Sequence, residues 1–163
     1  MNFKAKSLIV FLFLTIQISA CGSANSLSGS VSDLSWFNLS FDRVEITLDN
    51  EGLKINYYRE VSGSADPDIV ASVIVLREGT AIEANKDYDL AVYGSVDRFV
   101  RTRDADGSLQ VDPHIFKGIT AGTIRFSKLS PTSGRPIAGK FYITFTDGYT
   151  LNGSFSGNLI VQE

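Results

Sequence analysis

Apolar and polar residues alternate along most of the chain from about residue 31 onward. In the segment 42–48, for example, Val44, Ile46 and Leu48 fall on one side and the intervening polar residues on the other. An alternation of period two is typical of half-buried β-strands, and helical periodicity is nearly absent. The pattern therefore predicts a domain built from antiparallel strands.

Turn residues divide these strands. Asp49 to Gly52 is expected to turn the chain into a second strand, which forms a hairpin with the first. Ile69 to Leu76 is apolar on both faces, which predicts a central strand covered on both sides. Arg77 to Asp87 is expected to be a loop, and Tyr88 to Arg103 a long strand or strand pair with a bend at Gly94.

The C-terminal third predicts a meander of three strands, Ile119 to Leu129, Ile137 to Thr146 and Tyr149 to Val161. Glycines inside these strands predict bulges, bends or close approach of a second layer. Short strands spaced by about 8 to 12 residues favour an antiparallel β-sandwich of roughly 8–9 strands, with a closed β-barrel as the alternative. The fold class is all-β.

The first residues follow a different pattern. Leu8 to Ile18 is a nearly continuous apolar run preceded by Lys4 and Lys6, with no acidic residue beside them. Signal-peptide apolar cores run for about 7 to 15 residues, whereas a membrane-spanning helix needs about 20. The run therefore indicates an export signal over residues 1–20.

After the run, Ile18-Ser19-Ala20-Cys21 resembles the lipobox that ends the signal peptides of bacterial lipoproteins. Ile18 stands where that family prefers Leu. The resemblance implies that Cys21 carries diacylglycerol through a thioether and becomes the first residue after cleavage. Cys21 is the only cysteine, so it has no internal disulfide partner, and acyl chains on it would anchor the protein to a membrane.

In the sorting rule of that family, Asp after the cysteine retains the protein at the inner membrane. This chain has Gly22, so the resemblance implies an outer-membrane location. The small polar residues of 22–30 predict a flexible tether. We therefore expect a signal peptide (1–20), a lipidated cysteine with its tether (21–30) and one β-sandwich domain (31–163), since the length suits a single domain.

The net charge of the chain argues against nucleic acid as a partner. Loss of residues 1–20 lowers the 15 basic side chains to 13 and leaves the 18 acidic ones, a formal net charge of −5. Nucleic-acid binding needs clustered Lys and Arg, so nucleic acid is not an expected partner.

Catalytic and metal-binding patterns are weak. His114 is the only histidine and follows Asp112-Pro113, which favours a surface loop over an active site, and no GxSxG motif is present. Asp104, Asp106, Ser108 and Asp112 match part of a calcium loop. However, the twelfth position holds an isoleucine instead of Glu, so a hairpin turn is the preferred interpretation and no cofactor or metal is expected.

Two further sets of residues have alternative interpretations. Arg98, Arg101 and Arg103 would form either an anion-binding patch or, preferentially, a cross-strand ladder of salt bridges. Aromatic residues would serve either the core or a binding platform for a glycan or a protein. They are Trp36, Phe37, Tyr57, Tyr58, Tyr142 and Tyr149.

The spacing of Gly, Phe, Asp and Leu over residues 139–155 resembles that of small uncharacterised envelope lipoproteins of Gram-negative bacteria, which names no activity. We therefore expect a non-catalytic, lipid-anchored envelope domain that is structural or binds an envelope protein. The alternative hypothesis is a module that binds glycan or lipid, for which an apolar cavity in a barrel would be the structural evidence.

Overall fold

A computed structural model describes residues 25–76 and 82–162. The expected signal peptide and the expected lipid-attachment residue, Cys21, lie outside these ranges. Among the described residues, no helix is long and apolar enough to cross a bilayer.

The described chain is mainly strands with two short helices. The strands are β1 (Ser26–Ser28), β2 (Arg43–Leu48), β3 (Gly52–Arg59), β4 (Asp68–Leu76), β5 (Asp87–Asp89), β6 (Gly94–Phe99), β7 (Arg101–Arg103), β8 (Leu109–Val111), β9 (Ile119–Lys128), β10 (Pro136–Phe145) and β11 (Thr150–Val161). The helices are the 3-10 turn η1 (Ser30–Asp33) and α1 (Leu90–Tyr93).

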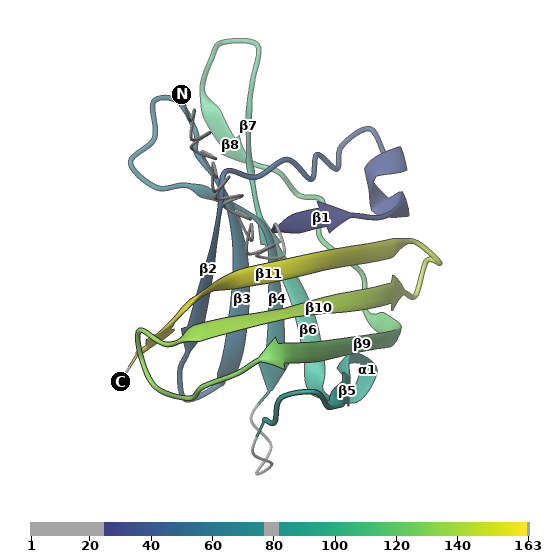
Figure 1. Cartoon of the computed structure of the whole chain (residues 1–163). Coiled ribbons are helices and arrows are strands. Elements are labelled where there is room, and N and C mark those ends of the chain that lie inside the picture. The colour runs from purple at the N-terminus through teal and green to yellow at the C-terminus, as the bar shows by residue number, and fades with distance from the viewer. Residues whose placement is uncertain (1–24, 77–81, 163) are drawn as a thin grey trace, which may run out of the picture.

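Nine strands form one mixed sheet in the order β5-β9-β10-β11-β2-β3-β4-β6, with β1 paired to β11, while β7 and β8 form a separate hairpin. Figure 1 shows two layers whose strands cross, with β9, β10, β11 and β1 in front of β2, β3, β4 and β6. Strand β11 joins the layers, because its last residues, Leu159 to Val161, pair in parallel with Ile46 to Leu48 of β2. The expected C-terminal meander and the β2–β3 hairpin are both present.

The all-β expectation is confirmed. The sheet folds over itself to form two layers, as in a sandwich. Its two edge strands, β5 and β6, are connected by helix α1, which also contacts β9. The sheet is therefore nearly closed into a barrel. The parallel β11–β2 pair was not expected. It arises because β11 continues past its hairpin partner into the other layer.

Two segments differ from the sequence expectation. Residues 90–93, inside the expected strand 88–103, are helical because the Asp89 carboxylate accepts a hydrogen bond from Ala91 N at 2.8 Å and caps the turn. Gly94 does mark the change of direction, since β6 begins there.

The prediction of a flexible tether over residues 22–30 is wrong for the second half of that range. Ser26, Leu27 and Ser28 pair with β11, and Leu27 packs against the core. The folded domain therefore begins by residue 25, not residue 31. Strand β1 has three residues, two of which are serine, so an alternation of apolar and polar side chains cannot be detected in its sequence. Only its pairing with β11 shows that it is a strand.

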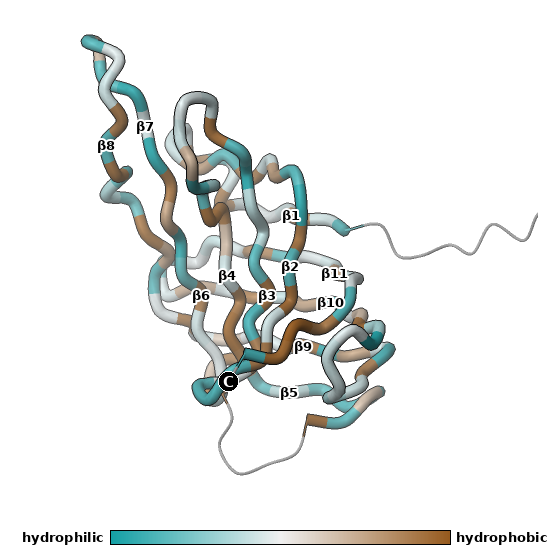
Figure 2. The backbone as a smooth tube through the Cα atoms, turned by 90° about the vertical axis from the view of Figure 1, so that its left-hand side faces the viewer, coloured by the Kyte–Doolittle hydropathy of each residue, from teal (hydrophilic) through white to brown (hydrophobic). Residues whose placement is uncertain are grey.

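The core lies between the two layers. Its fully buried side chains include Phe126, Phe155, Ile55 and Ile143, which come from both layers. The apolar run of β4, brown in Figure 2, lies between β3 and β6 as a central strand, as its sequence predicts. The core is therefore filled by side chains.

Glycine is required in β10, where the register shifts between Ala138 and Gly139. A Cβ at Gly139 would lie 2.4 Å from Arg125 O and 2.6 Å from Phe155 Cζ. At Gly157 in β11, the nearest atom to such a Cβ is Ile46 Cδ1 at an ordinary 3.6 Å.

We predict that Gly139→Ala lowers the free energy of unfolding by about 2 kcal/mol, because the clash with backbone forces a shift of the strands. Gly157→Ala is the matched control and is expected to change it by less than about 0.5 kcal/mol. Urea denaturation measures both. Equal effects of the two substitutions would contradict the close packing at Gly139.

Candidate functional site

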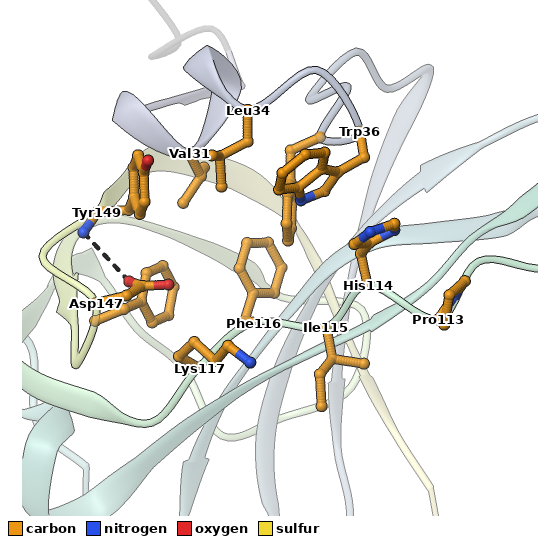
Figure 3. Close-up of a pocket in the computed structure, with 12 residues that line it drawn as sticks. Val31, Leu34, Trp36, Pro113, His114, Ile115, Phe116, Lys117, Asp147 and Tyr149 are labelled. Carbon is orange, nitrogen blue, oxygen red and sulfur yellow. Dashed lines mark hydrogen bonds between the residues drawn. The ribbon is translucent and has the colours of Figure 1, made fainter.

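A cleft of about 460 Å³ opens at one end of the two layers. Figure 3 shows its walls: the segment from η1 to Phe37 on one side, and residues 113–117, which follow β8, on the other. The turn between β10 and β11 supplies Asp147 and Tyr149. Its volume lies within the range of about 300 to 1,000 Å³ that is usual for small-molecule sites.

Two rings, one from each wall, stack at the mouth of the cleft. The Trp36 indole and the His114 imidazole have centroids 4.9 Å apart and planes inclined by 18°. Trp36 is 45% exposed and the side chain of His114 is also 45% exposed. The two walls therefore present a joint aromatic surface to solvent.

A buried arginine connects the two walls. The Arg98 side chain, from β6, is 2% exposed. Its guanidinium donates hydrogen bonds to His114 O at 2.7 Å and to Trp36 O at 3.3 Å. It also lies over the Phe37 ring at 4.7 Å. Arg98 thus fixes the backbone on both sides of the stacked rings.

Asp112 completes this network. Its Oδ2 accepts from both terminal nitrogens of Arg98 at 3.0 and 3.1 Å. Its Oδ1 accepts from His114 N at 2.9 Å and lies 2.5 Å from His114 Nδ1. The carboxylate therefore fixes the orientation of the imidazole.

Burial of Asp112 opposes its ionisation, but the hydrogen bonds from His114 and Arg98 and the positive charge of Arg98 outweigh it. Together they hold the pKa of the Asp112 carboxyl below its ordinary value of 3.8. The charged network persists at neutral pH.

The floor of the cleft is apolar. Phe37 packs on Phe116 at 5.0 Å between centroids, and Phe116 stacks on Phe145 at 5.2 Å. All three belong to the core cluster, so the floor is continuous with the core. Polar side chains stand around it: Lys117, Asp147 and Tyr149 line the cleft together with His114.

The other side chains that the sequence singled out serve different purposes. Among the described residues, no three His, Cys, Asp or Glu side chains gather as metal ligands do. Asp106 caps a turn by accepting from Ser108 N at 2.9 Å, and Asp112 is bound to Arg98 and His114. These contacts favour the hairpin-turn interpretation of Asp104 to Asp112.

The three arginines do not form a patch. Arg101 and Arg59 both pair with Asp68, which is fully buried, at 3.0 and 2.9 Å. Arg103 donates to the carbonyl oxygens of Gly107 and Ser62. Each guanidinium is thus bound within the domain, through ion pairs or carbonyl oxygens, and the three do not form one continuous ladder.

The aromatic candidates divide into three groups. Tyr57 is a core residue: it is fully buried, burial raises the pKa of its phenol, and its hydroxyl donates to Ser154 O at 2.9 Å. Trp36, Phe37 and Tyr149 line the cleft. Tyr58 lies under the Arg43 guanidinium and Tyr142 is exposed on the outer face of β10.

Sequence reasoning placed His114 in a surface loop and weighed Trp36 as a platform, but it did not bring the two together. Arg98 donates to Trp36 O across 62 positions of sequence, and short motifs cannot show such a pairing. The spacing Asp112-x-His114 was the one available indication, because a carboxylate two residues before a histidine can accept from its Nδ1.

Comparison with protein-family models, with curated proteins and with solved structures finds no match to this chain. The site is therefore interpreted from its own geometry.

We predict that Asp112→Asn lowers the free energy of unfolding at neutral pH by about 3 kcal/mol, because it leaves the Arg98 charge buried without a counter-charge. A carboxyl whose folded pKa is depressed contributes stability above its unfolded pKa, and this contribution is lost as pH falls through the folded pKa. The difference between wild type and variant should therefore narrow below about pH 4.

Urea denaturation at pH 7 and at about pH 2 tests this expectation. Asp104→Asn removes an exposed carboxylate of the neighbouring turn and is expected to follow the wild type at both pH values. A difference between wild type and Asp112→Asn that is the same at both pH values would contradict the role assigned to Asp112.

Proposed function

We propose that the protein is a lipid-anchored, non-catalytic binding module of the bacterial envelope, and that its cleft holds a sugar ring of a glycan against Trp36. The observation that carries the proposal is the half-exposed Trp36–His114 stack, which a buried network of Arg98 and Asp112 holds in place.

Net stability alone does not account for the buried network of Arg98 and Asp112. Buried ion pairs contribute little net stability relative to apolar residues, and Arg98 Nε has no hydrogen-bond partner among the described residues. What the network does provide is position, because it holds both walls and both rings. A preorganised surface loses little side-chain entropy when a ligand binds.

The lining favours a sugar over an acyl chain. One face of a pyranose ring consists of C–H groups and suits an exposed indole, while its hydroxyls need hydrogen-bonding partners. Lys117, Asp147 and His114 supply donors and acceptors around the apolar floor. An acyl chain would leave these groups without partners and would itself remain exposed, since Trp36 and Ile115 are 45% and 61% exposed.

The lining of the cleft supports binding in preference to catalysis. Nδ1 of the His114 imidazole contacts Asp112, as it would in a catalytic triad, but no Ser, Thr or Cys is among the residues that line the cleft. A histidine base in covalent catalysis needs such a nucleophile within hydrogen-bonding reach.

Docking of an envelope protein is the second candidate function. Val111 and Ile115, on the segment that leads into the cleft, are 57% and 61% exposed. Exposed apolar side chains that gather beside a cleft are a feature of protein interfaces. The same cleft would then receive a side chain of the partner.

Because Trp36 is the only tryptophan, its fluorescence reports directly on the cleft. We predict that the N-acetylglucosamine tetramer changes this fluorescence saturably in the full chain held in detergent. In calorimetry, Trp36→Ala and His114→Ala are each expected to weaken binding about tenfold, which corresponds to about 1.4 kcal/mol of lost stacking.

Phe99→Ala is the matched control, because Phe99 is 46% exposed but does not line the cleft. It should leave the affinity unchanged. If the tetramer neither alters the fluorescence nor releases heat, the glycan proposal fails and protein docking becomes the leading candidate.

The anchor has its own test. Metabolic labelling with a fatty-acid analogue is expected to mark the wild-type protein and to leave Cys21→Ala unlabelled, because the thiol is the site of thioether formation. Ser23→Ala is the control and should be labelled like the wild type. Equal labelling of the wild type and Cys21→Ala would exclude this anchor.

A further inference from the structure

A second surface lies on the outer face of the layer formed by β9, β10, β11 and β1, which faces the viewer in Figure 1. Phe141 and Ile143 of β10 are buried in the core, so Lys140 and Tyr142 point outward. The register places Lys140 opposite Arg125 of β9 on one side and Ser154 of β11 on the other. Two cations therefore face each other across neighbouring strands.

Like charges in directly opposed positions destabilise a sheet. Arg125 has one partial counter-charge, Asp87, at 3.3 Å, and both side chains of that pair are about half exposed. Lys140 has no ion pair with any described residue. The chain has 18 acidic residues, yet none of them occupies a position opposite Lys140.

The paired cations lie between two shallow hollows. One, of about 300 Å³, is lined by Asp87, Thr123 and Tyr142 together with both cations, so the carboxylate that pairs with Arg125 also borders this hollow. The other, of about 260 Å³, is lined by both cations together with Ser127, Gly139 and Ser154. Both hollows thus share Arg125 and Lys140, and neither shares a residue with the Trp36 cleft.

We propose that this face binds an acidic glycan, with a carboxylate or phosphate of the sugar seated between Arg125 and Lys140. The planar guanidinium and the ammonium group would neutralise the anion through charge-assisted hydrogen bonds. Thr123 and Ser127 line the adjoining hollows, and the Ser127 hydroxyl, which donates to Ala138 O at 3.3 Å, can still accept from a hydroxyl of the sugar. Tyr142, 51% exposed, offers a ring on which a neighbouring sugar can stack.

A sugar suits this surface better than an anionic membrane. Each Lys or Arg near a lipid surface strengthens attachment by only about fivefold, so two cations give weak binding. The face also includes the exposed hydroxyl side chains of Ser26 and Ser28, which suit sugar hydroxyls and contribute nothing to insertion between lipids.

Calorimetry on the full chain in detergent tests the proposal with four probes. Tetragalacturonate carries carboxylates, phosphorylated mannopentaose carries a phosphate, maltotetraose is neutral, and vesicles containing phosphatidylglycerol represent a membrane. We expect at least one acidic sugar to bind and the neutral sugar to bind at least about tenfold more weakly. The acidic sugar that binds identifies the anionic group.

Lys140→Gln and Arg125→Gln are each expected to weaken that binding about five- to tenfold at low salt, and added salt should weaken wild-type binding as well. Lys86→Gln makes the same change of charge on a lysine that is 52% exposed and borders neither hollow, so it should bind like the wild type. Failure of both acidic sugars to bind, or binding to vesicles alone, would overturn the proposal.

Lys140→Glu separates binding from folding. It places an acid opposite Arg125, so the thermal midpoint is expected to rise by about 1 to 2 °C while binding is lost. Retained binding in this variant would overturn the proposal. The Trp36 substitutions should not alter binding of the acidic sugar, so this site and the cleft succeed or fail independently.

Discussion

The architecture depends on one strand that belongs to both layers. Strand β11 pairs with β10 and β1 in the front layer and then, through Leu159 to Val161, with β2 in the other. Because the hydrogen-bonded ladder continues through β11, the layers cannot separate as the sheets of an ordinary sandwich can. The wall of the cleft also depends on β11, since Ser30 and Thr150 exchange hydrogen bonds at 3.1 and 2.9 Å.

The two walls of the cleft are held by a buried ion pair, a kind of contact that adds little net stability relative to apolar residues. Arg98 and Asp112 are charges buried at the end of an apolar core, and their hydrogen bonds reach the backbone or side chain of both stacked residues. Although Arg98 Nε has no partner among the described residues, the hydrogen bonds that the pair does make hold both walls of the cleft in one geometry. The rigid surface for Trp36 and His114 follows from this pair.

Most of the strands could be predicted because period-two alternation is a local property. The strands around Val44, Ile55 and Phe141 are each visible in fewer than ten residues, and the turns between them contain Asp, Asn and Gly. Strand β1 and helix α1 were not predicted, because a local pattern cannot be detected in so few residues. Each is only three or four residues long and is fixed by one neighbour, β11 for the strand and Asp89 for the helix.

The sequence by itself determined the all-β class, the meander and the central strand, because burial of alternate side chains requires no knowledge of the partner strand. The sequence also placed His114 in a surface loop, but it left Trp36 open between the core and a binding platform. Only the tertiary structure decided that these rings stack, that Arg98 lies behind them, and that Lys140 faces Arg125. These contacts join segments that are distant in sequence, and the path of the sheet through β11, together with its register, brings them together.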